Sequence, residues 1–126
     1  MPEPLAIAIR EVAAALDLDE HWLNAGPTDL LRFGLPDGFA DRVVVQHYGS
    51  LTVRLAARVD QVAFKLYAAV DQGPRSKHFR DLRQLHPTPG ELRAAARWCR
   101  THDTSEAFAD MLEQALAAFG VELSDV

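Results

Sequence analysis

The stretch RVVVQHYGSLTVRLAARVDQVAFKLYAAVDQGPRSKHFRDLRQL, residues 42–85, decides the fold. Its first part is rich in β-branched residues, and apolar side chains alternate with others from residue 51 to residue 57. Such alternation is typical of β-strands. Gly49-Ser50 between the two apolar runs suits a two-residue turn whose first position needs a positive φ. The stretch therefore predicts a β-hairpin with strands over 42–48 and 51–57.

Helical periodicity replaces the alternation after residue 57. Val62, Leu66 and Val70 mark one face of a helix over 58–71, which Gly73 and Pro74 end. A second helix begins near Ser76. The run Thr88-Pro89-Gly90-Glu91 has the pattern of a capping box with proline at the first helical position, and it predicts a helix over 89–101. A last helix over 105–118 is expected to bury an apolar stripe, formed by Phe108, Met111, Leu112, Leu116 and Phe119.

The amino-terminal third also reads as helical. Apolar residues at positions 5, 9, 12 and 16 predict an amphipathic helix over 4–16. Asp19 and Thr28 are expected to cap two short helices, and residues 35–38 form a turn. The predicted fold class is α+β, mostly helical, with one antiparallel hairpin packed by five to six helices. We expect one domain over 1–126, in which 42–85 holds the hairpin and the next two helices and 89–119 holds a helical pair.

Composition narrows the class of protein. Hydrophobic residues make up 48% of the chain and charged residues 25%, the balance of a globular domain. No apolar run approaches the roughly 20 residues of a membrane span, and acidic Glu3 stands where a secretory signal would be basic. We therefore expect a cytoplasmic protein with no membrane partner. Cys99 is the only cysteine and is expected in the core, and the five histidines show no metal-ligand spacing.

The net charge of −5 is unevenly distributed. Residues 75–100 carry seven basic side chains against Asp81 and Glu91, whereas residues 101–126 carry six acidic side chains and no Lys or Arg. Such a basic segment can attract phosphate groups even in an acidic chain. The same charges are equally compatible with solvated helix faces that pair with acidic neighbours.

Lys65 is the most informative single residue. It borders the apolar face of the helix over 58–71, and Asp60, five residues earlier, is poorly placed for a pair within the helix. The ammonium group therefore needs a partner elsewhere or must reach solvent. Two antiparallel helices joined at Gly73-Pro74 would bring it to Asp81. The residues alone leave two interpretations open, a structural salt bridge and a lysine that binds the phosphates of a nucleotide.

Residues 42–85 resemble the carboxy-terminal half of AbiEii-type toxins and related minimal nucleotidyltransferases. In that group a hairpin leads into a helix with Lys-Leu-x-Ala, followed by a basic turn and a Lys-x-x-x-Asp-Leu segment. The corresponding residues are Lys65 to Ala68, then Arg75, then Lys77 to Leu82. The resemblance implies that Lys65 and Asp81 contribute to the catalytic nucleotide site, with Arg75 and Lys77 as substrate-binding residues that face the phosphates.

One part of the family pattern is missing. An active enzyme of this group needs a Gly-Ser turn that feeds a helix and then an Asp-x-Asp or Asp-x-Glu pair that holds Mg²⁺. Asp17-x-Asp19 is the only such pair ahead of Lys65, and no glycine precedes it. We therefore assign no metal-binding residue. Magnesium and a nucleoside triphosphate are expected as cofactors only if a partner chain completes the site.

The leading hypothesis is thus a partial nucleotidyltransferase-like domain without catalysis in isolation, which binds a nucleotide or RNA or is completed by a partner chain. An alternative is a non-enzymatic protein-interaction module, such as an antitoxin or regulatory subunit. A third is simple binding of RNA or phosphate by the basic 75–100 segment. An interaction module needs an exposed apolar patch, whereas the nucleotide hypothesis needs an open polar site at Lys65 and Asp81.

Overall fold

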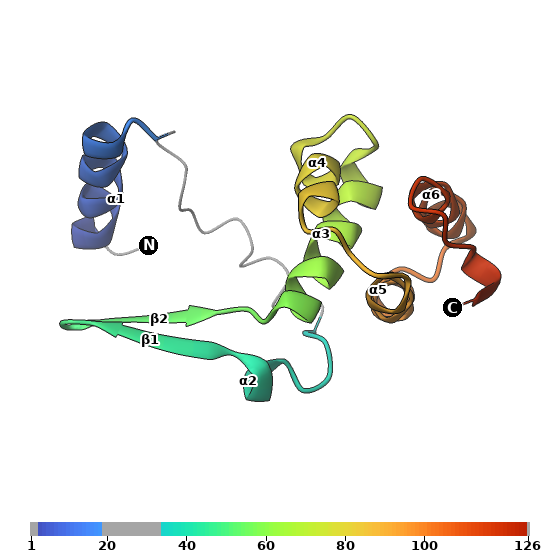
Figure 1. Ribbon diagram of the computed structural model, residues 1–126, viewed down its shortest axis with the longest axis horizontal. Coiled ribbons are helices and arrows are strands. Elements are labelled where there is room, and N and C mark those ends of the chain that lie inside the picture. Colours follow the sequence, from blue (N-terminus) through green and yellow to red (C-terminus); the bar gives the residue numbers. More distant parts are fainter. Residues whose placement is uncertain (1–2, 19–33, 126) are drawn as a thin grey trace. The chain divides into compact units, whose positions relative to one another are not determined.

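The computed structural model describes residues 3–18 and 34–125. Its chain divides into two compact units, Met1–Leu35 and Pro36–Val126, and each is described here by itself. In the described residues the elements are six α-helices, one antiparallel hairpin and a short 3-10 helix near the carboxy terminus (Figure 1). The predicted α+β class is confirmed. The single-domain organisation of the whole chain stays a prediction.

The first unit contains helix α1, Glu3–Leu16, close to the predicted bounds. Its buried residues are Ile9 and Ala13, whereas Val12 is 37% exposed and Leu16 is 66% exposed. Val12 and Leu16 were therefore wrongly placed on the buried face of α1. Residues 9 and 13 are four positions apart and lie above one another on the helix, and this row faces inward while residue 12 lies beside it. The two short helices expected from residues 19 and 28 lie outside the described residues.

The second unit begins with a turn and a single helical turn, α2, Phe39–Arg42. Gly38 precedes α2 with φ 79°, a left-handed conformation that glycine adopts without strain. The strands follow as β1, Val44–Tyr48, and β2, Leu51–Leu55. Both strands are shorter than predicted. Arg42 in particular was wrongly expected in a strand, because it ends α2 and its side chain is bound by residue 60.

The hairpin pairs in a regular antiparallel register. Val44 lies opposite Leu55, Gln46 opposite Val53 and Tyr48 opposite Leu51, which leaves a two-residue turn. Gly49 in that turn has φ 62°, as predicted. Since directly opposed residues share a face, five apolar side chains gather on one face of the hairpin. We call this the apolar hairpin face, and its members are Val44, Tyr48, Leu51, Val53 and Leu55.

Four helices complete the second unit. They are α3, Arg58–Gln72; α4, Lys77–Gln84; α5, Pro89–His102; and α6, Glu106–Ala117. Each lies within two residues of its prediction. Ser76, Thr88 and Ser105 cap the last three through their hydroxyl groups, and Thr88 and Glu91 form the predicted capping box. The remaining element is the 3-10 helix η2, Leu123–Asp125.

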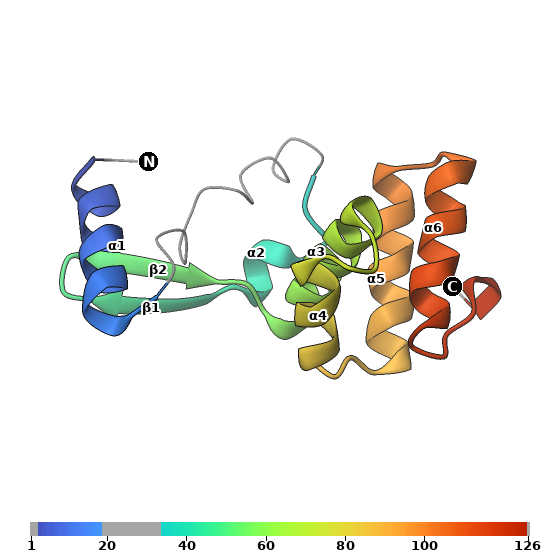
Figure 2. The same cartoon turned by 90° about the horizontal axis from the view of Figure 1, so that it is seen from above.

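Helix α3 is the centre of this unit, because α4, α5 and α6 all pack on it (Figures 1 and 2). Val62 and Leu66 of α3 are fully buried, and the other helices contribute fully buried or nearly buried leucines to the same core, namely Leu82, Leu92, Leu112 and Leu116. Cys99 is buried there too, as predicted, and burial raises the pKa of its thiol to about 12. Met111 was wrongly placed in the core. It is 44% exposed, because the buried row of α6 runs through Phe108, Leu112 and Leu116.

An ion pair with a buried carboxylate joins α2 to the start of α3. Asp60 is only 1% exposed, and its two carboxylate oxygens accept hydrogen bonds from Nε of Arg42, at 2.9 Å, and from Nη2 of the same guanidinium. The Nη1 group of Arg42 donates to the carbonyl oxygen of Asp37 at 2.8 Å. Hydrogen bonding to Asp60 raises the pKa of Arg42. This two-pronged geometry offsets the cost of removing the Asp60 charge from water and ties both ends of the hairpin to α3.

Removing Arg42 alone should destabilise the protein strongly. In Arg42→Ala the Asp60 carboxylate stays buried without a counter-charge, and breaking a buried pair in this way should lower the unfolding midpoint by at least about 10 °C. Thermal unfolding followed by circular dichroism measures the shift. Arg54→Ala, which removes an exposed arginine from β2, is the control and should change little. Adding Asp60→Asn to Arg42→Ala should restore part of the loss, and no recovery would contradict the argument.

Candidate functional site

The structure brings Lys65 and Asp81 together, as the sequence predicted. Lys65 lies midway along α3, beside buried Leu66, and Asp81 lies midway along α4. Gly73, with φ 95°, ends α3, and Ser76 caps α4 by accepting a hydrogen bond from the Phe79 amide. These two termini reverse the chain so that α4 packs on α3. The Lys65 Nζ group then donates to Asp81 Oδ2 at 2.9 Å.

The ion pair is open to solvent. The Lys65 side chain is 35% exposed and the Asp81 side chain 40%; in the Arg42–Asp60 pair the cation is also 35% exposed, and only the Asp60 carboxylate, at 1%, is buried. An exposed pair of this kind contributes little to stability, at most about 1 kcal/mol. The hydrogen bond from Lys65 lowers the pKa of Asp81, so the carboxylate is ionised at neutral pH. The pair is therefore a charged edge between two helices that solvent or a ligand can reach.

His78 belongs to the same edge and was not singled out from the sequence. It lies three residues before Asp81 on α4, which puts the two side chains on one side of the helix. Burial lowers the pKa of His78 first, and the positive charges of Lys65 and Lys77 lower it further, so the imidazole is neutral at pH 7. Its Nδ1 atom is buried and has no hydrogen-bond partner among the described residues. The i, i+3 spacing from Asp81 is the signal in the sequence that points to it.

The two predicted phosphate-facing residues lie at the entrance to α4. Arg75 is exposed in the turn between α3 and α4, and Lys77 is exposed at the first position of α4. Lys77 is near enough to act electrostatically on His78. Neither Arg75 nor Lys77 makes an ion pair within the part of the chain that the structure describes. Whether either one faces a phosphate stays a prediction.

The chemistry of this edge suits an anion better than a metal ion. A lysine ammonium has three N–H donors, and Asp81 uses one of them, which leaves two for the oxygens of an incoming phosphate. Magnesium, which the family resemblance implies, needs several oxygen ligands. The Asp81 oxygen is held by Lys65, and the described residues contain no group of three His, Cys, Asp or Glu side chains that could hold a metal ion. The described residues therefore do not fit a magnesium site, and no metal step is assigned to them.

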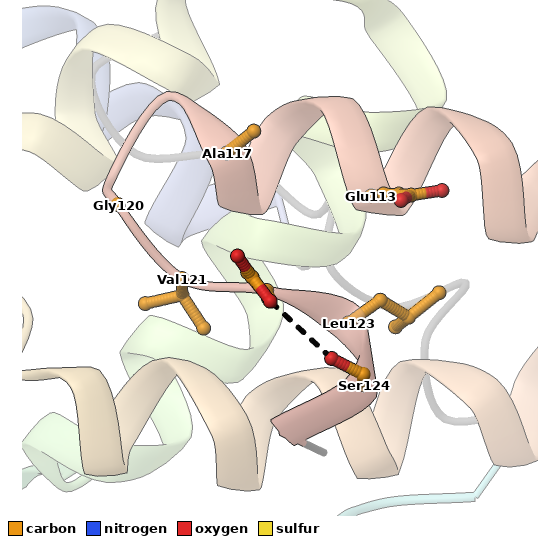
Figure 3. Close-up of a pocket in the computed structure, with 7 residues that line it drawn as sticks. Glu113, Ala117, Gly120, Val121, Leu123 and Ser124 are labelled. Atoms are coloured by element: carbon orange, nitrogen blue, oxygen red, sulfur yellow. Dashed lines mark hydrogen bonds between the residues drawn. The ribbon is translucent and has the colours of Figure 1, made fainter.

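A hollow lies at the carboxy-terminal end of the unit, where α6 turns into η2 (Figure 3). Its volume is about 570 Å³, and its polar lining consists of Glu113, Glu122 and Ser124. The Ser124 hydroxyl lies 3.5 Å from the Glu122 carboxylate. The hollow has no cationic or aromatic lining residue that would select a ligand. It contains none of the site residues predicted from the sequence.

The helices of the protein and its similarity to known proteins complete the description of the site. No helix in the described residues is long and apolar enough to cross a membrane. Comparisons with protein-family models, with the curated proteins and with the solved structures find no match to this chain.

Proposed function

We propose that the chain is a partial nucleotidyltransferase-like domain that binds the phosphates of a nucleotide at the edge formed by Lys65, His78 and Asp81. The observation that carries the proposal is the 2.9 Å contact between Lys65 Nζ and Asp81 Oδ2, made by side chains that are both more than a third exposed. This lysine keeps donors available on the solvent side.

The three residues take different roles in this proposal. Lys65 supplies the positive charge and two hydrogen-bond donors to the phosphate oxygens. Asp81 is a positioning residue, because its hydrogen bond holds the long lysine side chain in one place and lowers the entropy lost on binding. His78 lies next to the same charge, and its lowered pKa favours the neutral imidazole. Arg75 and Lys77, both exposed at the start of α4, add a positive field.

We propose further that nucleotide transfer requires a second polypeptide that supplies the metal-binding carboxylates. The support is twofold. The resemblance to AbiEii-type toxins covers only the half that follows those carboxylates, and Asp81 itself is engaged by Lys65. Of the pair Asp17-x-Asp19, the first lies just after α1 and the second lies outside the described residues.

Lys65→Ala should weaken the binding of a nucleoside triphosphate while the fold remains intact. The loss of one charge-assisted contact should cost roughly 1.5–3 kcal/mol, which is about ten- to a hundredfold in affinity. Calorimetric titration at low salt, where screening is weakest, measures the change. Arg54→Ala removes the same charge from the hairpin and should leave the affinity unchanged. Equal binding by Lys65→Ala and the wild type would leave the ion pair with a structural role only.

The purified chain alone should not transfer a nucleotide to RNA or protein in the presence of Mg²⁺ and nucleoside triphosphates. Incorporation of a radioactive nucleotide label is the measurement. If label is incorporated and the signal disappears in Asp17→Asn, then Asp17-x-Asp19 is a metal site and the proposed need for a second polypeptide is wrong.

A second candidate function, a protein-interaction module, is favoured by the apolar hairpin face. Four of its five residues are between 42% and 60% exposed, namely Val44, Tyr48, Leu51 and Leu55. Two-stranded hairpins are only marginally stable by themselves, and exposed apolar patches often mark contact surfaces. Such a module would be an antitoxin-like or regulatory partner whose nucleotide contacts are secondary.

The double substitution Tyr48→Gln with Leu51→Gln distinguishes the two functions. If the hairpin face is an interface, the variant should lose any self-association or partner binding that the wild type shows in analytical ultracentrifugation, because two apolar side chains leave the buried surface. Triphosphate binding should persist, since Lys65 lies on α3. Thr52→Gln on the opposite face is the control. A wild-type chain that is monomeric and unchanged by the substitutions would remove the support for this candidate.

A further inference from the structure

The three arginines of α5 form a stripe that no described carboxylate neutralises. Arg93, Arg97 and Arg100 follow one another at spacings of four and three residues, so they lie on one side of the helix. The opposite side of α5 carries Trp98 and His102, whose rings contact α3 through Tyr67. The arginine stripe is therefore separate from both the aromatic contacts and the buried row of α5.

Three other cations of the second unit are each paired with a carboxylate. Arg42, Arg58 and Lys65 each bind a carboxylate, at Asp60, Glu91 and Asp81. No such ion pair is made by Arg93, Arg97 or Arg100 within residues 3–18 and 34–125. The absence is informative, because residues 101–126 hold six acidic side chains that follow directly in the chain. The pKa of Asp103 is lowered mainly by hydrogen bonds from Ser105 and to a smaller extent by the charge of Arg100. The Asp103 carboxylate accepts a hydrogen bond from the Ser105 amide and makes no ion pair with Arg100 among the described residues.

Arg100 adds an independent observation. Its Nη1 atom is buried and has no hydrogen-bond partner among the described residues. A buried N–H group without an acceptor is costly, and one common explanation is a ligand or ion that supplies the acceptor. Arg100 is half-buried, whereas the neighbouring Arg97 is exposed and can be reached by a ligand directly.

We infer that the arginine stripe of α5 binds the phosphate backbone of a nucleic acid. The three side chains span about 10 Å along the helix axis, at 1.5 Å per residue. One strand of a duplex advances about 3.4 Å along the duplex axis per phosphate, so a stripe of this length covers about three such steps. Arginine rather than lysine occupies all three positions, and its planar fork binds phosphate oxygens in pairs. This site is distinct from the Lys65 edge and does not depend on it.

Binding to labelled oligonucleotides tests the inference. Fluorescence anisotropy is measured over a range of salt concentrations, with a single-stranded RNA and a duplex DNA as separate probes. The wild type should bind at low salt. Arg93→Gln with Arg97→Gln should weaken binding and reduce the slope of log affinity against log salt by about 1.4 for the single strand or about 1.8 for the duplex, since each phosphate contact contributes roughly 0.7 or 0.9. The probe that the wild type binds more tightly at the same salt concentration identifies the source of the phosphates.

Controls separate this site from general charge effects. Arg10→Gln with Arg54→Gln removes the same number of charges from α1 and β2 and should leave the slope unchanged. Arg93→Lys with Arg97→Lys keeps both charges and should retain most of the slope of log affinity against log salt. This variant changes the same two positions as the glutamine variant, so it shows whether substitution there disturbs the fold. Triphosphate titration of the glutamine variant should match the wild type, so this site and the Lys65 edge can fail separately. The inference would be overturned if the wild type did not bind, or if both glutamine variants lost affinity equally. It would also be overturned if polyglutamate displaced the labelled probe as effectively as unlabelled nucleic acid.

Discussion

Burial of one face of α3 is the constraint on which the second unit depends. Val62 and Leu66 are fully buried, and α4, α5 and α6 all pack against this helix. Removal of apolar surface from water supplies most of the driving force for such packing. A charged residue beside the buried face of this helix must find a partner or reach solvent, and two charged residues of α3 do so by pairing with side chains outside the helix. These are Asp60 at its start and Lys65 in its middle.

The two ion pairs of α3 differ in the burial of the carboxylate and in the number of hydrogen bonds that join the partners. Asp60 is buried, and both of its oxygens are bound by Arg42, so this pair fixes the entry of the hairpin and has no capacity for a ligand. Lys65 and Asp81 meet through one hydrogen bond at the solvent edge. The second pair therefore keeps unused donors, and it is held in place by helices whose own packing does not require it. That combination of rigidity and unused bonding capacity is what a binding site needs.

The surface of the second unit is divided into regions of different character. The hairpin exposes apolar side chains and carries a single charged residue, Arg54. Helix α5 carries its arginine stripe, and the segment that follows is acidic. Segregation of this kind restricts which partners each region can accept, because apolar faces exclude solvated phosphates and an unpaired arginine disfavours an apolar contact. The proposed nucleotide site and the α5 stripe both fall outside the hairpin.

The sequence by itself determined the elements whose signals are local. The hairpin turn at Gly49-Ser50, the capping box at Thr88 and the bounds of α3 to α6 all follow from residues a few positions apart. It also indicated the contact of Lys65 with Asp81, because a short turn between two helices restricts which side chains can meet. Tertiary structure decided the rest. The partner of Asp60 lies 18 residues away, the exposure of Met111 depends on which row of α6 meets α3, and the place of His78 beside Lys65 depends on how α4 packs. Side chains distant in the chain meet only once the helices have packed, and periodicity along one helix carries no information about its neighbour.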